Sequence, residues 1–231
     1  MCLCGLFAQD AKKIPVSGYY LGMWLRNLAI GAALVMTAAA SSIPDPAVDV
    51  PVTKDKQTAV FSGGCFWGVD AVFKRVKGVG KVVSGYSGGE ARTASYDIVS
   101  TGQTGHAESV QVTYDPSVVT YGKLLKVFFG VAHDPTELNY QGPDHGTQYR
   151  SAIFYANEDQ KKAAEAYIAQ LNQAHVYRKP IVTQVTQLKA FYPAEPYHQN
   201  YLAMHPNQPY IVYNDMPKLS QLKKQLPELA K

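Results

Sequence analysis

Hydrophobic residues recur along the chain with two different periods. Residues 106–114 alternate between two faces, which is typical of a strand, and Asp115 and Pro116 then end it. Residues 66–76 place apolar side chains three and four positions apart, which is typical of an amphipathic helix. Further strands are predicted over residues 58–62, 79–86, 149–155 and 181–188. Further helices are predicted over residues 121–132 and 158–174, the second of them capped by Asn157.

Polar and glycine-rich segments separate these elements. Loops are predicted over residues 87–105 and 133–148, and the polar stretch from Val212 onward is predicted to be a surface tail. Strands and helices interleave in a mixed order, which predicts a two-layer α/β or α+β domain. The expected organisation is an N-terminal extension over residues 1–42, a linker over 43–56, one folded domain over 57–213 and a C-terminal tail over 214–231.

The N-terminal extension is predicted to be a targeting segment. Arg26 is followed by an uncharged run of 13 residues, Leu28–Ala40, whereas a membrane-spanning helix needs about 20. A short apolar run that ends in small residues is typical of a signal peptide, and a start at Met23 would give a compact one. We therefore expect cleavage and export, with a periplasmic location. An uncleaved segment that anchors the protein to a membrane is the alternative.

Composition limits the class of protein. Hydrophobic residues make up 46% of the 231 residues and charged residues 17%, so the chain can build a core and is not disordered as a whole. A net charge of +4 is too small to indicate a nucleic-acid partner. Three cysteines exclude a disulfide-stapled scaffold and a four-cysteine zinc site. The sequence has no dinucleotide-binding glycine motif and no metal-ligand histidine spacing, so no bound cofactor or metal is expected.

Cys65 is the one cysteine outside the N-terminal extension, which holds Cys2 and Cys4. It follows two glycines and precedes a predicted helix, where free N–H groups and the helix dipole favour an anion. The position is therefore expected to lower the pKa of the thiol and leave it reactive. A buried, inert cysteine is the alternative. Phe66 and Trp67 either wall an apolar pocket beside the thiol or belong to the core-facing side of the helix.

The segment around Cys65 resembles the active-site region of the A-type peptide methionine sulfoxide reductases, which act on the S epimer: FSGGCFWGVDAVFKRVKGVGKVVSGYSGG. Three more blocks are similar to that family and follow in its order: GHAESVQVTYDP, HDPTELNYQGPDHGTQYRSAIF and FYPAEPYHQNYL. The resemblance covers residues 57–213. It implies a mixed sheet with flanking helices, a ferredoxin-like-type core and long loops. It also implies an oxidoreductase that repairs proteins after oxidative damage, acting on peptide-bound and free methionine sulfoxide.

Reduction of a sulfoxide by a thiol needs a nucleophilic sulfur and an acid for the departing oxygen. By resemblance, Cys65 is the nucleophile and Glu108 is the proton donor. Strand alternation puts Glu108 on the same face as apolar residues, where burial would keep it protonated, and a surface glutamate is the alternative. Tyr96 and Tyr149 match the two active-site tyrosines of the family, and they are expected to donate neutral hydrogen bonds to the oxygen.

The substrate-binding residues that the resemblance implies are Phe66, Trp67 and Asp144. The two aromatic rings would seat the methyl group and so select the epimer. Asp144 would hold a water molecule or the backbone amide of the substrate, and a simple turn residue is its alternative role. His106 and His145 flank the other site residues and are expected to be structural or solvated.

No cysteine follows Cys65, whereas many family members carry one that forms a disulfide with the oxidised nucleophile. We therefore expect a sulfenic acid at Cys65 that is resolved by an external thiol, either a thioredoxin-like or glutaredoxin-like protein or a small thiol. The expected partners are oxidised proteins or peptides and this thiol donor, with the enzyme as a monomer. The alternatives are a redox sensor that binds oxidised methionine without turnover and a cysteine hydrolase.

Overall fold

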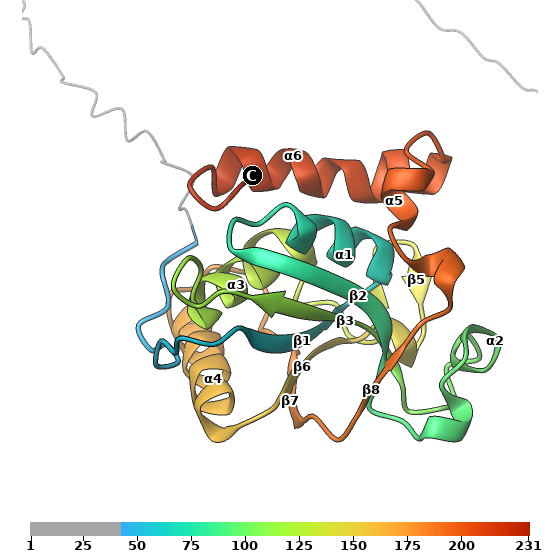
Figure 1. Ribbon diagram of the computed structural model, residues 1–231, viewed down its shortest axis with the longest axis horizontal. Helices are drawn as coiled ribbons and strands as arrows, with labels where there is room; N and C mark the ends of the chain where they lie inside the picture. Colours follow the sequence, from blue (N-terminus) through green and yellow to red (C-terminus); the bar gives the residue numbers. More distant parts are fainter. Residues whose placement is uncertain (1–42) are drawn as a thin grey trace, which may run out of the picture. The chain divides into compact units, whose positions relative to one another are not determined.

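The computed structural model describes residues 43–231, which form a six-stranded sheet with helices packed against it (Figure 1). The strand order is β7-β6-β1-β3-β2-β8. Every neighbouring pair is antiparallel except β6 and β7, which are parallel, and this confirms the predicted mixed sheet. The strands are β1 Gln57–Gly63, β2 Val79–Ser87, β3 Ala107–Tyr114, β6 Ser151–Tyr155, β7 Gln184–Gln187 and β8 Phe191–Pro193, and a separate hairpin pairs β4 Tyr140–Gln141 with β5 Asp144–His145.

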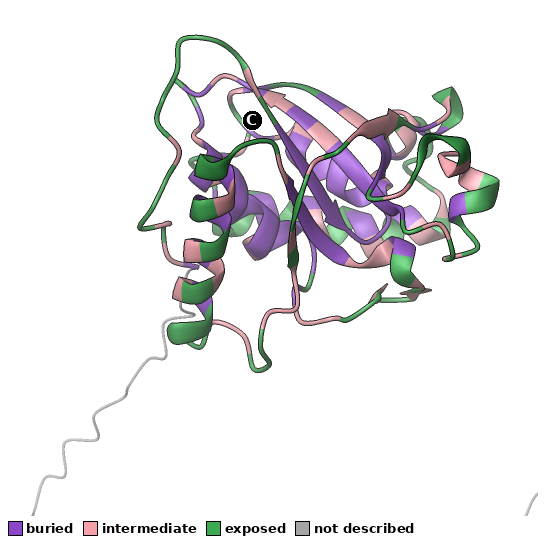
Figure 2. Cartoon of the chain, turned by 90° about the horizontal axis from the view of Figure 1, so that it is seen from below, coloured by how far each residue is buried: buried purple, intermediate pink, exposed green. Residues whose placement is uncertain are grey.

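The main hydrophobic core lies between the helices and one face of the sheet. Phe61 of β1, Val112 of β3 and Ile153 of β6 share this face. Phe61 stacks on Phe73 and on Phe128, with ring centroids 5.1 and 5.0 Å apart. Figure 2 shows buried residues concentrated in the central strands and on the inner sides of the helices.

The helices are α1 Phe66–Lys74, α2 Tyr96–Val99, α3 Tyr121–Val127, α4 Glu158–Gln173, α5 Tyr201–Met204 and α6 Met216–Gln225. Two π-helical turns extend α3 and precede α6, over Phe128–Ala132 and Ile211–Asp215. Three-residue 3-10 turns occur at Ala91–Thr93, Thr147–Tyr149 and Pro196–His198.

Most predicted elements are confirmed, with shifts at their ends. Asn157 caps α4 as predicted, because its side-chain oxygen accepts a hydrogen bond from the backbone N–H of Gln160 at 2.9 Å. The strand predicted over 181–188 is shorter, since β7 holds only its central residues. The loop predicted over 87–105 contains two helical turns, including α2, and the loop predicted over 133–148 contains the β4–β5 hairpin.

The predicted surface tail after residue 213 is wrong. Most of this segment forms α6, which packs against α1, and Leu219 and Leu222 are buried there. Leu226 and Leu229 follow and are buried as well. The four leucines recur every three or four residues, which is helical spacing. The surrounding lysines and glutamines make the average composition of the stretch polar. A prediction from composition therefore missed the apolar face that the leucines form.

The predicted linker over residues 43–56 contains no helix or strand, yet its first part is held against the domain. The backbone C=O of Pro44 accepts a hydrogen bond from the hydroxyl of Tyr167 at 2.7 Å. The carboxylate of Asp45 forms an ion pair with Lys126, also at 2.7 Å. These contacts join the segment to α3 and α4, so it behaves as part of the fold.

The predicted signal peptide lies outside the described residues, together with its apolar run over 28–40, Met23, Cys2 and Cys4. Within residues 43–231, no helix is both long enough and apolar enough to cross a membrane.

Candidate active site

Cys65 lies between the end of β1 and the first turn of α1, where the glycine pair predicted it. Gly64 has a φ of +87°, and a Cβ atom there would come within 2.5 Å of Gln141, so only glycine lets the chain turn here. Cys65 is 8% exposed and borders a small cavity of about 80 Å³. It is therefore not enclosed by core on every side. The cavity is also lined by Gln141, Gly142, Pro143, Asp144, Tyr210, Asn214 and Lys218.

Glu108 points into the protein from β3, on the face that strand alternation predicted. The residue is 3% exposed, and its Oε2 accepts a hydrogen bond from the backbone N–H of Phe66 at 3.0 Å. Burial raises the pKa of Glu108 to about 8, the Phe66 N–H lowers it, and the nearby Asp144 carboxylate raises it. At neutral pH the side chain is therefore a buried carboxylic acid that can give up a proton beside the start of α1.

The expectation of a lowered thiol pKa at Cys65 is wrong for the resting protein. Burial raises the pKa of the thiol well above its usual range, and the Glu108 and Asp215 carboxylates raise it further. The backbone N–H of Trp67 lowers this pKa, which is the predicted helix-start effect, but it is outweighed. When Glu108 is neutral, its charge no longer raises the pKa of the Cys65 thiol. The protonation states of the acid and the thiol are therefore linked.

Tyr96 and Tyr149 lie close to both of these groups. Tyr96 begins the short helix α2, and Tyr149 ends the 3-10 turn before β6 rather than starting the strand as predicted. Burial raises the pKa of each phenol, and the charges of Glu108 and Cys65 raise both further. Both hydroxyls are therefore neutral donors. A sulfur nucleophile, a neutral carboxylic acid and neutral hydroxyl donors together suit attack on a group whose oxygen must be protonated.

Phe66 and Trp67 occupy different environments. Phe66 is buried, with its ring centroid 5.0 Å from that of His198. Trp67 is partly exposed, stacks on Tyr201 at 3.7 Å, and meets the edge of Tyr210 at 5.9 Å. Phe66 thus belongs to the core, whereas Trp67 lies in an aromatic cluster that reaches the surface near the Cys65 cavity.

Asp144 lies in β5 and lines the Cys65 cavity. The hydroxyl of Tyr210 donates a short hydrogen bond to its carboxylate. Burial raises the pKa of Asp144, while the Tyr210 hydrogen bond and the Lys218 charge lower it. Sequence reasoning missed both partners. Tyr210 was one of 16 tyrosines, and Lys218 lay in the segment taken for a tail.

A buried ion pair supports the first turn of α1. Asp215 has no exposed surface, and its Oδ1 accepts a hydrogen bond from Lys218 Nζ at 3.2 Å. A Cβ atom at Gly68 would come within 2.1 Å of that oxygen, so the pair can approach α1 only because residue 68 is glycine. Lys218 therefore places a positive charge at the Cys65 cavity, held there by Asp215.

Glu195 was also missed by sequence reasoning, and it connects two tyrosines. Its Oε2 accepts a hydrogen bond from the Tyr86 hydroxyl at 2.9 Å, and its Oε1 accepts one from the backbone N–H of Tyr96 at 2.9 Å. The second bond fixes the start of α2, from which the Tyr96 side chain extends. The only signal in the sequence was its place inside the block FYPAEPYHQNYL.

The two flanking histidines take structural or exposed positions, as expected. His106 is buried, accepts a hydrogen bond from the Gly89 N–H at 3.2 Å, and pairs through Nε2 with the Glu90 C=O at 3.0 Å. His145 is exposed and stacks on Tyr140. Across the described part of the chain, no group of three or more His, Cys, Asp or Glu side chains is arranged to hold a metal ion.

The chain is similar to one protein family over nearly all of its described length. The family model described as peptide methionine sulfoxide reductase matches residues 57–229, which includes α6. A peptide methionine sulfoxide reductase MsrA 2 of Mesorhizobium japonicum is 58% identical over 182 residues, covering 79% of this chain and 93% of the relative. A protein of the same name from Synechocystis is 48% identical over 208 residues, covering 88% and 97% of the two chains.

Solved structures give the same result for the fold. The reduced form of Mxr1 from Saccharomyces cerevisiae has a TM-score of 0.61 and 33% identity, covering 68% of this chain and 91% of the other. Methionine sulfoxide reductase A of Corynebacterium diphtheriae has a TM-score of 0.59 and 33% identity, covering 71% and 87%.

Proposed function

This chain belongs to the peptide methionine sulfoxide reductase family, and we propose that it reduces the S epimer of methionine sulfoxide with Cys65 as nucleophile. It is an oxidoreductase that reduces methionine sulfoxide and so repairs oxidised proteins. One observation carries the assignment of residues. Cys65 borders a cavity, and the next residue, Phe66, donates a backbone hydrogen bond to Glu108, an acid with a pKa raised to about 8.

The first step transfers the sulfoxide oxygen to Cys65. Glu108 donates a proton to that oxygen while Cys65 Sγ attacks the sulfoxide sulfur, and the thiol proton returns to the Glu108 carboxylate. This attack forms a bond between Sγ and the substrate sulfur. The protonated oxygen then passes from the substrate sulfur to Sγ, so that both this sulfur–sulfur bond and the sulfur–oxygen bond of the substrate break and methionine leaves. Cys65 holds the oxygen as a sulfenic acid, so the substrate sulfur gains two electrons and the Cys65 sulfur loses two.

The surrounding residues orient the substrate. Tyr96 and Tyr149 donate hydrogen bonds to the sulfoxide oxygen, because both phenols stay neutral beside Glu108. Trp67 offers its partly exposed ring to the methyl group. Phe66 supports that surface from the core. Asp144 holds a water molecule or the backbone amide of the substrate at the mouth of the cavity.

An external thiol completes the cycle. Within residues 43–231 Cys65 is the only cysteine, so that part of the chain offers no internal disulfide. A first external thiol condenses with the sulfenic acid, releasing water and leaving a mixed disulfide. A second thiol then releases Cys65 as a thiol. The donor is a thioredoxin-like or glutaredoxin-like protein or a small thiol, and the enzyme acts as a monomer.

The proposed location is outside the cytoplasm, in a periplasm. The uncharged run over residues 28–40 and the small residues that end it support a cleaved signal peptide. The alternative is that the segment is not cleaved and anchors the protein to a membrane. Mass spectrometry of the N-terminus of the protein isolated from its native cells distinguishes the two.

The test is turnover on each sulfoxide epimer separately, with dithiothreitol as reductant. We expect many turnovers on the S epimer, none on the R epimer, and none for Cys65→Ser. A single equivalent of product with excess thiol would instead identify a redox sensor. One turnover without reductant should leave about one dimedone-reactive sulfenic acid per chain at Cys65. An intramolecular disulfide in that sample would contradict the single-cysteine cycle.

A further inference from the structure

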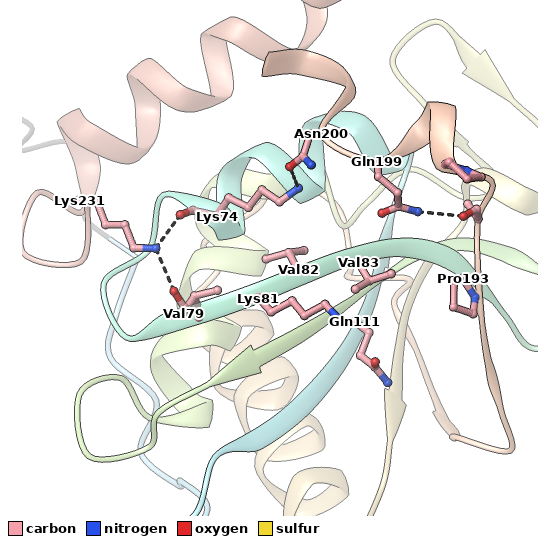
Figure 3. A pocket seen from close by; sticks show the side chains of 13 residues that line it. Lys74, Val79, Lys81, Val82, Val83, Gln111, Pro193, Gln199, Asn200 and Lys231 are labelled. Carbon is pink, nitrogen blue, oxygen red and sulfur yellow. Dashed lines mark hydrogen bonds between the residues drawn. The ribbon is translucent and has the colours of Figure 1, made fainter. Parts of the chain in front are cut away.

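A groove runs along the free edge of β2 (Figure 3). It meets α1 at its last residue, Lys74, whereas Cys65 precedes the first residue of that helix. Its volume is about 660 Å³, within the range of about 300–1,000 Å³ that binding pockets occupy. Val82 and Val83 of β2 line it on one side and Lys74 at the end of α1 lines it on another. None of the residues proposed to take part in catalysis lines this groove.

The edge of β2 is closed at one end by β8 with Gln199 and at the other end by Lys231. β8 pairs only with Gly85–Ser87. Next to that pairing, the backbone N–H of Ala194 donates to the Ser84 C=O at 2.9 Å, and the side-chain amide of Gln199 accepts from the Ser84 N–H at 3.0 Å and donates to the Ser84 C=O at 2.9 Å. At the other end, Lys231 Nζ donates to the Val79 C=O at 2.9 Å (Figure 3).

The main-chain groups of Val82 lie between these two closures. In an antiparallel ladder the N–H and C=O of one residue point to the same side, and successive residues alternate. Ser84 directs both groups away from β3, so Val82, two residues earlier, does the same. No described residue bonds to these groups of Val82. An unpaired donor and acceptor on a strand edge form a template for another strand.

The positive charge of the groove indicates which kind of polypeptide would bind at the β2 edge. Lys74, Lys81 and Lys231 line it, and no Asp or Glu side chain does. The buried carboxylate of Asp70 forms an ion pair with Lys74 and offsets part of the positive charge of the groove. Lys81 is exposed and shares the open face of the sheet with Val83. A second copy of this chain is a poor occupant, since pairing two β2 edges would bring the same lysines together.

We propose that an extended, acidic polypeptide segment binds in this groove by adding a strand to β2 at Val82, with alternate carboxylates against Lys81 on the open face of the sheet. Between the two closures, from Gly80 to Val83, the edge spans roughly 10 Å at about 3.3 Å per residue, which accommodates about four residues of the added strand. Lys74 at the last turn of α1 lines the groove, whereas Cys65 precedes the first turn, so the groove is separate from the proposed active site and the proposal does not rest on the proposed function. An occupant there leaves Cys65 free for a second segment of the same polypeptide.

The test uses the full chain and a peptide that the proposed active site cannot recognise. The probe is acetyl-Glu-Val-Glu-Thr-Glu-Val-amide, which lacks methionine and cysteine, and its binding is measured by titration calorimetry at two salt concentrations. We expect saturable binding that weakens with salt. Lys81→Glu should weaken it at least about five-fold, whereas the matched surface variant Lys162→Glu on α4 should not. Cys65→Ser should bind the peptide as wild type does.

Two further measurements test whether the peptide binds by adding a strand to β2. Methylating alternate peptide nitrogens removes the donors that a strand edge needs, so the methylated peptide should not bind. Hydrogen exchange at the Val82 amide should slow in the presence of the unmodified peptide. The proposal is overturned if the lysine analogue of the peptide binds equally well, if Lys81→Glu and Lys162→Glu behave alike, or if exchange at Val82 does not change. Unaltered reduction of free methionine sulfoxide by Lys81→Glu would show that the variant is folded.

Discussion

The backbone N–H of Phe66 donates a hydrogen bond to the Glu108 carboxyl at 3.0 Å, and this bond joins the first residue of α1 to the middle of the sheet. Phe66 follows the nucleophile directly in the chain. The acid and the thiol are therefore held together by one main-chain contact, on elements that are themselves buried. Small displacements of α1 would change both groups at once.

Replacing Glu108 with Gln should reduce kcat about 100-fold or more, because the proton for the departing oxygen is lost while the shape of the side chain is kept. In wild type, kcat should fall as pH rises above about 8, since the working form of Glu108 is protonated. This decline should be absent from the residual activity of Glu108→Gln. The exposed Glu165→Gln on α4 serves as the control. A wild-type rate for Glu108→Gln would remove Glu108 from the mechanism.

Burial of Glu108 should also make folding depend on pH. The pKa is about 8 in the folded protein and near its ordinary value of 4.5 in the unfolded chain, so the folded state binds more protons between these values. The free energy of unfolding should therefore decrease as pH rises from 4.5 to 8. Urea unfolding of wild type and Glu108→Gln at several pH values isolates this contribution. It should be missing from the variant, and parallel curves for the two proteins would contradict the raised pKa.

Leu222→Ala should lower the free energy of unfolding by about 2–4 kcal/mol, because the side chain is 1% exposed and its loss leaves a cavity under α6. The matched control is Leu138→Ala, since Leu138 is 59% exposed and its truncation should change stability little. Chemical denaturation followed by circular dichroism measures both. Equal, small effects would mean that α6 is not part of the cooperative fold.

Tyr210→Phe should reduce kcat/KM about ten-fold, because it removes one hydrogen bond to a partly buried carboxylate at the Cys65 cavity. Asp144 would then lack the donor that positions it and lowers its pKa. The control is Tyr213→Phe on an exposed ring of the same segment, which should keep wild-type kinetics. Steady-state rates on a methionine sulfoxide peptide provide the comparison, and identical losses in both variants would mean that the hydroxyl of Tyr210 has no particular role.

Local patterns in the sequence were enough to predict the parts of the site that depend on local structure. Period-two alternation put Glu108 on the same face of β3 as apolar residues, and the family resemblance favoured that face as the inner one. The glycine pair with the following apolar spacing placed Cys65 at the start of α1. Both results depend on residues within a few positions of one another. The capping of α4 by Asn157 was predictable for the same reason.

What could not be predicted depends on contacts between distant segments. The thiol pKa of Cys65 is dominated by burial and by Glu108, a residue 43 positions away in the chain, rather than by the local helix start. Tyr210 and Glu195 act through partners that only the fold brings near. The role of α6 was obscured by its polar composition, although its leucines had the right spacing.

Trp67 is one of two tryptophans in the chain, and the other, Trp24, precedes the described residues. Its indole stacks on Tyr201 and lies two positions after the nucleophile. In a protein that begins after residue 42, all indole emission would come from this one ring. Docking of a ligand and oxidation of the neighbouring sulfur could then be followed as intrinsic fluorescence changes, in real time and without any added dye.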